Sequence, residues 1–249
     1  MEKVKKLPPE VRKRFFKQRA HDLLCNNHDL PFYKFEGEPS DELTNPLDIL
    51  TEQYQTLIET VAENGWTIPL SIDIRKFDEL KSHLDSDESI ASFYENYYSG
   101  RELRYIYRQA KKMVPMGAQQ KAFEECFDAY NNKQFTICRT ALISVLERMI
   151  SEFNSNPCDV RVMHVCESKA KDERSAGNNI KSLCWLSMYK FTKILCDKSD
   201  FCQNEPLTMN RHWIEHGRTN RIDDGLDCLK LFNAISTMAY IKSCDKGIS

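Results

Sequence analysis

The stretch from Thr208 to Arg221 holds the chain's densest group of side chains for acid–base and phosphate chemistry near neutral pH. Its fourteen residues include three arginines, two histidines, one glutamate and two asparagines. Histidine titrates near pH ~6.5 and can act as a general base or a general acid. The planar arginine guanidinium stays charged and matches the oxygens of a phosphate. These residue types suit the cleavage of a phosphodiester.

The order of residues in this stretch is as informative as its composition. Arg211 is followed directly by His212 and, after four intervening residues, by His216. This arrangement resembles the signature of the HEPN superfamily, in which an arginine, a polar residue and a later histidine mark a metal-independent RNase. The string Asn210-Arg211-His212 with His216-Gly217 is also similar to the motif of bacterial HEPN-like proteins of abortive-infection type.

The resemblance implies roles for individual residues. We predict that His216 is the general acid or base and that Arg211 stabilises the crowded phosphorane, with Asn210 and His212 shaping the site. The expected products carry a 2',3'-cyclic phosphate and a 5'-hydroxyl, and we expect neither a cofactor nor a metal. The resemblance further implies a homodimer with a composite active site, a bacterial defence or toxin role, an RNA substrate and an antitoxin or other regulatory partner.

Two other functions stay open. The chain could be a non-catalytic HEPN-like module that binds RNA or a partner protein, or a helical scaffold in which the motif is accidental. Other enzyme signatures give no competing prediction, because the chain has no P-loop, no dinucleotide-binding glycine fingerprint, no Gly-x-Ser-x-Gly and no His-Glu-x-x-His.

Further cations are candidates for contacting RNA. Arg218 and Arg221 follow the motif and are predicted as peripheral phosphate contacts rather than catalysts. Arg104, Arg108 and Lys111 recur at three- and four-residue steps in a predicted helix over 101–112, so they share a ridge. That ridge is either an RNA-backbone contact or an ordinary solvated helix face.

Glu147 interrupts an apolar stretch late in a predicted buried helix, where an unpaired carboxylate would be costly. One interpretation is that it reaches across to orient Arg211 or a histidine of the site. The other is a salt bridge to a neighbouring arginine, either Arg148 or Arg139. The sequence leaves both open.

The hydrophobic periodicity predicts an all-α chain. The resemblance implies that these helices form a HEPN-type bundle with an N-terminal helical extension. We place the boundary at Val114-Pro115-Met116-Gly117, with an extension over 1–116, a possible sensor or substrate-binding region, and a HEPN-like domain over 117–249. Predicted helices cover 46–63, two or three segments of 73–114, 118–130, 134–153, 178–196 and 224–242. The pair 118–130 and 134–153 is similar to the helical hairpin that precedes the motif in HEPN proteins.

Three further expectations concern surfaces. Leu231, Met238 and Ile241 widen the apolar stripe of the last helix, which predicts a surface for a partner helix. The polar segment 154–177 is predicted as a mobile excursion over the site. Residues 1–20 carry eight Lys and Arg against two Glu, which is either an RNA-backbone patch or a solvated helix face.

Composition limits the possible classes. The 249 residues are 41% hydrophobic, enough for a sizeable core, and the formal net charge of -2 excludes a uniformly basic coat for nucleic acid. None of the ten cysteines forms a Cys-x-x-Cys pair, and we interpret most of them as packing thiols in a reducing compartment. The start has no apolar signal region and no stretch is long and apolar enough for a membrane span, so we predict a cytoplasmic protein.

Overall fold

The computed structural model describes residues 46–68, 74–84, 87–154, 156, 161–222 and 225–245, and within these ranges the regular structure is entirely helical. The helices are α3 (Pro46–Glu63), α4 (Ile74–Ser82), α5 (Asp87–Tyr98), α6 (Glu102–Lys111), α7 (Ala118–Asn131), α8 (Phe135–Ser151), α9 (Val162–Ser175), α10 (Asn179–Leu195), α11 (Arg211–Glu215) and α12 (Leu226–Asp245). The prediction of an all-α chain is confirmed for these residues. The basic segment 1–20 lies outside them.

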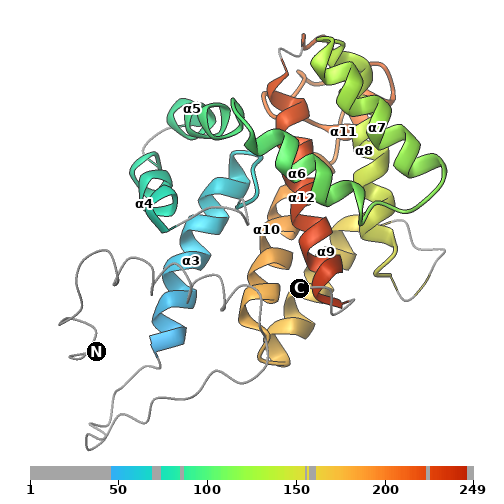
Figure 1. The fold of residues 1–249 in the computed structure, drawn as a ribbon. Helices are drawn as coiled ribbons and strands as arrows, with labels where there is room; N and C mark the ends of the chain where they lie inside the picture. The colour runs from blue at the N-terminus through green and yellow to red at the C-terminus, as the bar shows by residue number, and fades with distance from the viewer. Residues whose placement is uncertain are drawn as a thin grey trace, which may run out of the picture.

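Helix α12 is the central element of the bundle (Figure 1). It packs against α6 and α8 and also contacts α10 and α5. Leu231, Met238 and Ile241 are each fully buried within the chain. The expectation that they provide a surface for a partner helix is therefore wrong, because helices of the same chain already cover α12 on several sides. A helix that is apolar on all sides is typical of such a central position.

Helices α7 and α8 form the predicted hairpin and lie against each other. The turn between them requires a positive φ of 58° at Lys133. Cys126 and Cys138 are buried where the two helices meet, and each thiol donates to the other residue's carbonyl oxygen, over 3.7 and 3.2 Å. Both cysteines are free, as are the others in the described ranges, which confirms the interpretation of these two as packing thiols.

Helix α9 corrects the prediction for residues 154–177. The greater part of this segment is a regular helix that packs along α10, rather than an excursion over the site. Val162, Val165, Cys166 and Ala170 are buried, and their spacing follows one face of a helix. The many charged residues between them are mostly on the solvent side, and they obscured this apolar stripe in the sequence.

The helices that precede residue 116 attach to α12 through buried polar groups. Asn233 Oδ1 accepts hydrogen bonds from Thr67 N at 2.6 Å and Thr67 Oγ1 at 2.7 Å, and Asn233 Nδ2 donates to the Tyr98 hydroxyl at 2.7 Å. A buried amide without partners would cost about 1–3 kcal/mol, so these bonds fix where the segment after α3 meets α12. One hydrophobic core includes residues from both sides of 116. The division of the chain there stays a prediction.

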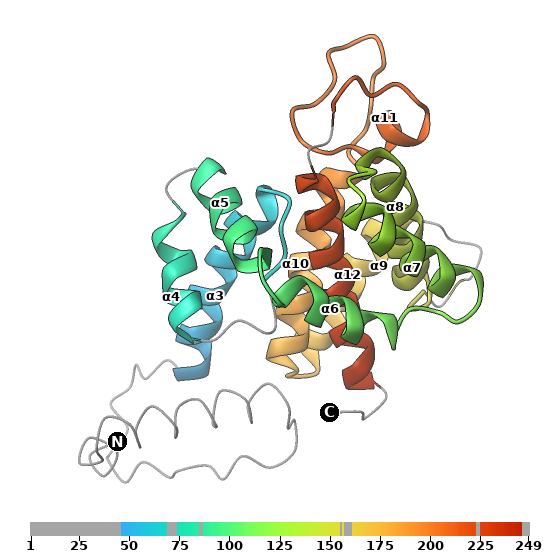
Figure 2. The same cartoon turned by 45° about the horizontal axis from the view of Figure 1, so that its top comes forward.

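Helix α11 lies at one end of the bundle, where the loops on either side of it project beyond the long helices (Figure 2). It contacts α8. The motif residues are therefore carried by a short element at the tip of the molecule, and the long helices below form its support. No helix in the described part of the chain is long and apolar enough to cross a membrane.

Candidate functional site

Asn210 begins α11 as its N-cap. Its backbone is extended, with φ -128° and ψ 122°, and its Oδ1 accepts hydrogen bonds from the backbone N–H groups of His212 at 2.9 Å and Trp213 at 3.3 Å. The same side chain is only 4% exposed, accepts from Ser199 Oγ and donates from Nδ2 to the Asp197 carbonyl. Asn210 therefore ties the loop that follows α10 to the start of α11.

Gly217 ends α11 in a Schellman arrangement. Its φ is +62°, its N–H donates to the carbonyl of Ile214 at 3.1 Å, and Arg218 N–H donates to the carbonyl of Trp213 at 2.8 Å. Glycine adopts this left-handed conformation at little cost. Trp213 and Ile214 are buried. A helix of five residues is too short to be stable alone, so its two capped ends and these buried side chains hold it in place.

Arg211 lies between two carboxylates. Its Nη1 is 2.5 Å from Glu147 Oε1 on α8, and its Nε donates to Glu215 Oε2 one turn later at 3.0 Å. Glu147 Oε1 receives no hydrogen bond from any described residue despite its short distance to Nη1, so this contact is an ion pair with poor hydrogen-bond angles. Of the two interpretations of Glu147, the structure shows the contact with Arg211.

The local environment changes the ionisation of this group. Burial raises the pKa of the Glu147 carboxyl above its usual range, although the charge of Arg211 opposes the shift. Burial acts to lower the pKa of Arg211, but the two carboxylates outweigh it and the pKa is raised. Burial also raises the pKa of the neighbouring Cys196 thiol to about 11. Arg211 therefore stays positively charged, and Glu147 and Glu215 already balance part of this charge.

His212 and His216 share a face of α11, as their four-residue spacing predicts. Their rings are nearly parallel, at an interplanar angle of 7°, with centroids 6.4 Å apart. His212 is half-buried, whereas His216 is exposed at the C-cap. The His216 ring also lies roughly perpendicular to the Phe201 ring, with centroids 5.7 Å apart. Sequence reasoning did not single out Phe201, because nothing in its local pattern indicates that its loop folds back over α11.

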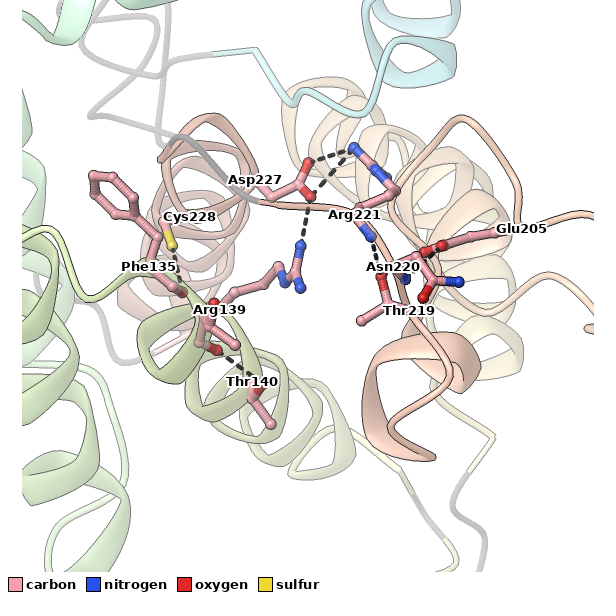
Figure 3. Close-up of polar contacts among 10 residues, drawn as sticks. Phe135, Arg139, Thr140, Glu205, Thr219, Asn220, Arg221, Asp227 and Cys228 are labelled. Carbon is pink, nitrogen blue, oxygen red and sulfur yellow. Dashed lines mark hydrogen bonds and ion pairs between the residues drawn. The ribbon is translucent and has the colours of Figure 1, made fainter.

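Arg218 and Arg221 have different surroundings. Arg218 is exposed, and its guanidinium carbon lies 5.5 Å from the centre of the Phe201 ring. Arg221 instead turns toward Asp227 at the start of α12, with Nη2 3.4 Å from the carboxylate (Figure 3). The predicted role of Arg221 as an RNA contact therefore has to compete with an ion pair inside the chain.

A buried ion pair beside Arg221 was not predicted. Arg139 on α8 is 1% exposed, and its Nη1 lies 3.2 Å from Asp227 Oδ2 (Figure 3). Arg139 Nε has no hydrogen-bond partner in the described part of the chain. The available signal was the position of Arg139 on the apolar face of α8, four residues before Ile143. Its partner is 88 positions away and could not be inferred.

The predicted basic ridge lies on α6, away from α11. Arg104 and Arg108 are exposed, while Lys111 is half-buried and lies 2.8 Å from Glu124 on α7. The hydrogen bond to Glu124 raises the pKa of Lys111. Helix α6 packs across α12, whereas α11 lies at the end of the bundle (Figure 2). The structure therefore brings Glu147, Asn210 and the motif together and leaves the ridge separate.

Comparison of the chain with protein-family models, with curated proteins and with solved structures gave no match in any of the three. Within the described ranges, no group of three or more His, Cys, Asp or Glu side chains is placed to hold a metal ion. The resemblance to HEPN proteins therefore stays a prediction from the residues of the motif.

Proposed function

We propose that this chain is a metal-independent endoribonuclease of HEPN type, with Arg211 and His216 as its principal residues. The observation that carries the proposal is the placement of an exposed imidazole and a fixed guanidinium on one capped helix at the end of the bundle. Asn210 holds the start of that helix, and Glu147 holds the guanidinium from α8.

The reaction is a transesterification within the RNA. A base removes the proton of a 2'-hydroxyl, the resulting oxygen attacks the adjacent phosphorus, and an acid protonates the departing 5'-oxygen. The products are a 2',3'-cyclic phosphate and a 5'-hydroxyl. Arg211 supplies positive charge to the phosphorane. Glu147 and Glu215 hold its guanidinium at this end of the bundle.

One exposed imidazole cannot serve as base and acid at the same moment. We therefore include in the proposal a homodimer, in which His216 of each copy takes one of the two roles across a twofold axis. The resemblance to HEPN proteins supports this arrangement, together with a role in bacterial defence or toxicity and control by an antitoxin or other regulator. We also propose a cytoplasmic setting, which the free and mostly buried cysteines of the described ranges support.

A specific observation favours a second candidate function. Arg211 already has two carboxylate neighbours, which reduces its attraction for a phosphate. An arginine held in this way also fits a non-catalytic module, in which the motif maintains α11 and RNA or a partner protein binds elsewhere on the surface.

The decisive experiment is a cleavage assay on total RNA and transfer RNA in EDTA with analysis of the new ends. We expect wild type to give cyclic-phosphate ends, His216→Ala to lose roughly 10²–10⁴-fold in rate and Arg211→Ala roughly 10²–10³-fold. His164→Ala and Arg174→Ala are matched controls, because both residues are exposed on α9, and they should cleave as wild type does. RNA left intact by folded, dimeric wild type, or cleaved equally by all variants, would reject the enzyme.

A further inference from the structure

The loop between α10 and α11 presents an aromatic side chain next to the motif. Asp200 forms a tight turn there: its side chain accepts from Cys202 N at 2.9 Å and its carbonyl from Gln203 N at 2.9 Å. Phe201, inside this turn, is 39% exposed. Asn210 anchors the same loop through Asp197. Phe201 is therefore held at the surface by a defined backbone.

The contacts of the Phe201 ring place it beside His216. The buried Trp213 meets it at a centroid distance of 5.3 Å and an angle of 78°, and His216 meets it at 5.7 Å and 75°. Both neighbours are roughly perpendicular to the ring. Such edge contacts orient an aromatic ring without stacking on it.

Arg218 differs from the other two arginines of the stretch in its charge balance. Arg211 has Glu147 and Glu215 as ion-pair partners, and Arg221 has Asp227. No described carboxylate forms an ion pair with Arg218, which is exposed and lies over Phe201. Of these three arginines, Arg218 therefore has the charge most available to a phosphate.

We infer that Phe201 and Arg218 form a nucleotide subsite beside His216, in which Phe201 stacks on an unpaired base and Arg218 binds the neighbouring phosphate. This inference rests on the proposed action on RNA and names the substrate class as single-stranded RNA. A base within a duplex is already stacked on both faces, whereas an unpaired base can leave its neighbours and stack on an aromatic ring. The flexible Arg218 side chain can move from the ring to the phosphate as the base arrives.

The test measures binding separately from cleavage. Short single-stranded and duplex RNAs that are 2'-O-methylated throughout, and so lack the attacking hydroxyl, are titrated with the full chain by fluorescence anisotropy. We expect Phe201→Leu, which keeps apolar packing on Trp213 but loses the aromatic face, to bind the single strand roughly 5- to 100-fold more weakly. Phe201→Trp should retain binding, and Met116→Ala, at an exposed apolar residue before α7, should change nothing.

Two further readouts identify the contacts. A 2-aminopurine base in the single strand should lose fluorescence on binding wild type and retain it with Phe201→Leu, because stacking quenches it. Arg218→Gln should lower the slope of log affinity against log salt by roughly 0.7, the value for one phosphate contact on a single strand.

The outcomes separate the two proposals. Equal binding of duplex and single strand by wild type, or unchanged single-strand binding by Phe201→Leu, overturns the subsite even if unmodified RNA is cleaved. Selective binding that depends on Phe201, without cleavage of unmodified RNA, keeps the subsite and rejects the ribonuclease. A wild type that binds neither RNA overturns the subsite, and cleavage of unmodified RNA then decides separately whether the chain is a ribonuclease.

Discussion

Two clusters of arginine and carboxylate lie near the same end of the bundle and differ mainly in their burial. In one, Asp227 lies between the fully buried Arg139 and the partly exposed Arg221 (Figure 3). In the other, Arg211 lies between Glu147 and Glu215, and these side chains keep 22–32% of their surface in solvent. Both clusters consist of guanidinium and carboxylate groups, so we attribute any difference in their contribution to stability to burial.

The difference follows from the cost of removing a partner. A charge left alone in the interior cannot recover its hydration, whereas a half-exposed charge regains most of it. We therefore expect the Arg139 and Asp227 pair to control stability and the Arg211 group to affect stability little. Because the Arg211 group contributes little to stability, Arg211 can exchange one of its carboxylate partners for a ligand. The predictions below test this contrast, in order of decreasing effect.

The largest effect is expected from Asp227→Ala. This change leaves Arg139 buried without its carboxylate, and removal of one partner of a buried pair typically costs about 3–5 kcal/mol of the free energy of unfolding. Urea denaturation followed by circular dichroism measures it. Glu215→Ala is the comparison from the other cluster and should cost less than about 1 kcal/mol.

A second variant tests whether charge or packing explains this loss. Arg139→Met combined with Asp227→Leu replaces the buried pair by apolar side chains and should recover much of the stability that Asp227→Ala loses. If Asp227→Ala costs no more than Glu215→Ala, burial does not distinguish the two clusters.

The next effect concerns Asn210, the N-cap of α11. By capping this helix, Asn210 holds Arg211 and Glu215 in place, a role that burial has for Arg139 and Asp227. Asn210→Ala removes an N-cap and should lower the free energy of unfolding by about 1–2 kcal/mol, since it also frees the Asp197 carbonyl. Asn210→Asp keeps the capping oxygen and should lose less. Asn132→Ala, which removes one exposed side-chain bond at the end of α7, is the control and should stay near wild type in the same urea assay.

The helices could be predicted where apolar residues recur at helical spacing and a clear break follows. The predicted segment 46–63 matches α3, and the two or three segments predicted within 73–114 correspond to α4, α5 and α6. Helix α9 was missed because its buried side chains are small and alternate with charges. The predicted partner surface on α12 was also wrong, since a sequence shows that a helix face is apolar but does not show what covers it.

The candidate site could likewise be predicted from the sequence only where its contacts are local. The shared face of His212 and His216 follows from local spacing alone, and Gly217 is a recognisable helix stop. The contact of Glu147 with Arg211 was one of two alternatives, because residues so far apart in the chain meet only once the bundle is assembled. The Arg139 and Asp227 pair gave no comparable local signal.

A smaller effect is expected from Glu215→Gln. Removal of this negative charge leaves Arg211 with Glu147 as its only described ion-pair partner, so the affinity for single-stranded RNA at low salt should rise by roughly 2- to 5-fold, the size of an exposed ion pair. Glu167→Gln is a matched control, because Glu167 forms an i,i+4 pair with Lys171 on α9. A rise with both variants would indicate a general effect of net charge, and no rise with Glu215→Gln would show that Arg211 does not contact RNA.

The smallest expected effect is a change in the free energy of unfolding with pH that is due to Glu147. Burial raises the pKa of this carboxyl in the folded chain above the value of about 4.3 expected when unfolded, while Arg211 opposes the shift. The folded chain therefore holds the proton more tightly, and this contribution to stability is present at low pH and is lost as pH rises through the folded pKa. Glu147→Gln cannot titrate, so the unfolding free energy of wild type minus that of the variant should fall as pH rises from about 4.3 through the folded pKa. A difference that rises over this range would mean that attraction to Arg211 outweighs burial, and that the half-exposed cluster stabilises the fold as the buried one does.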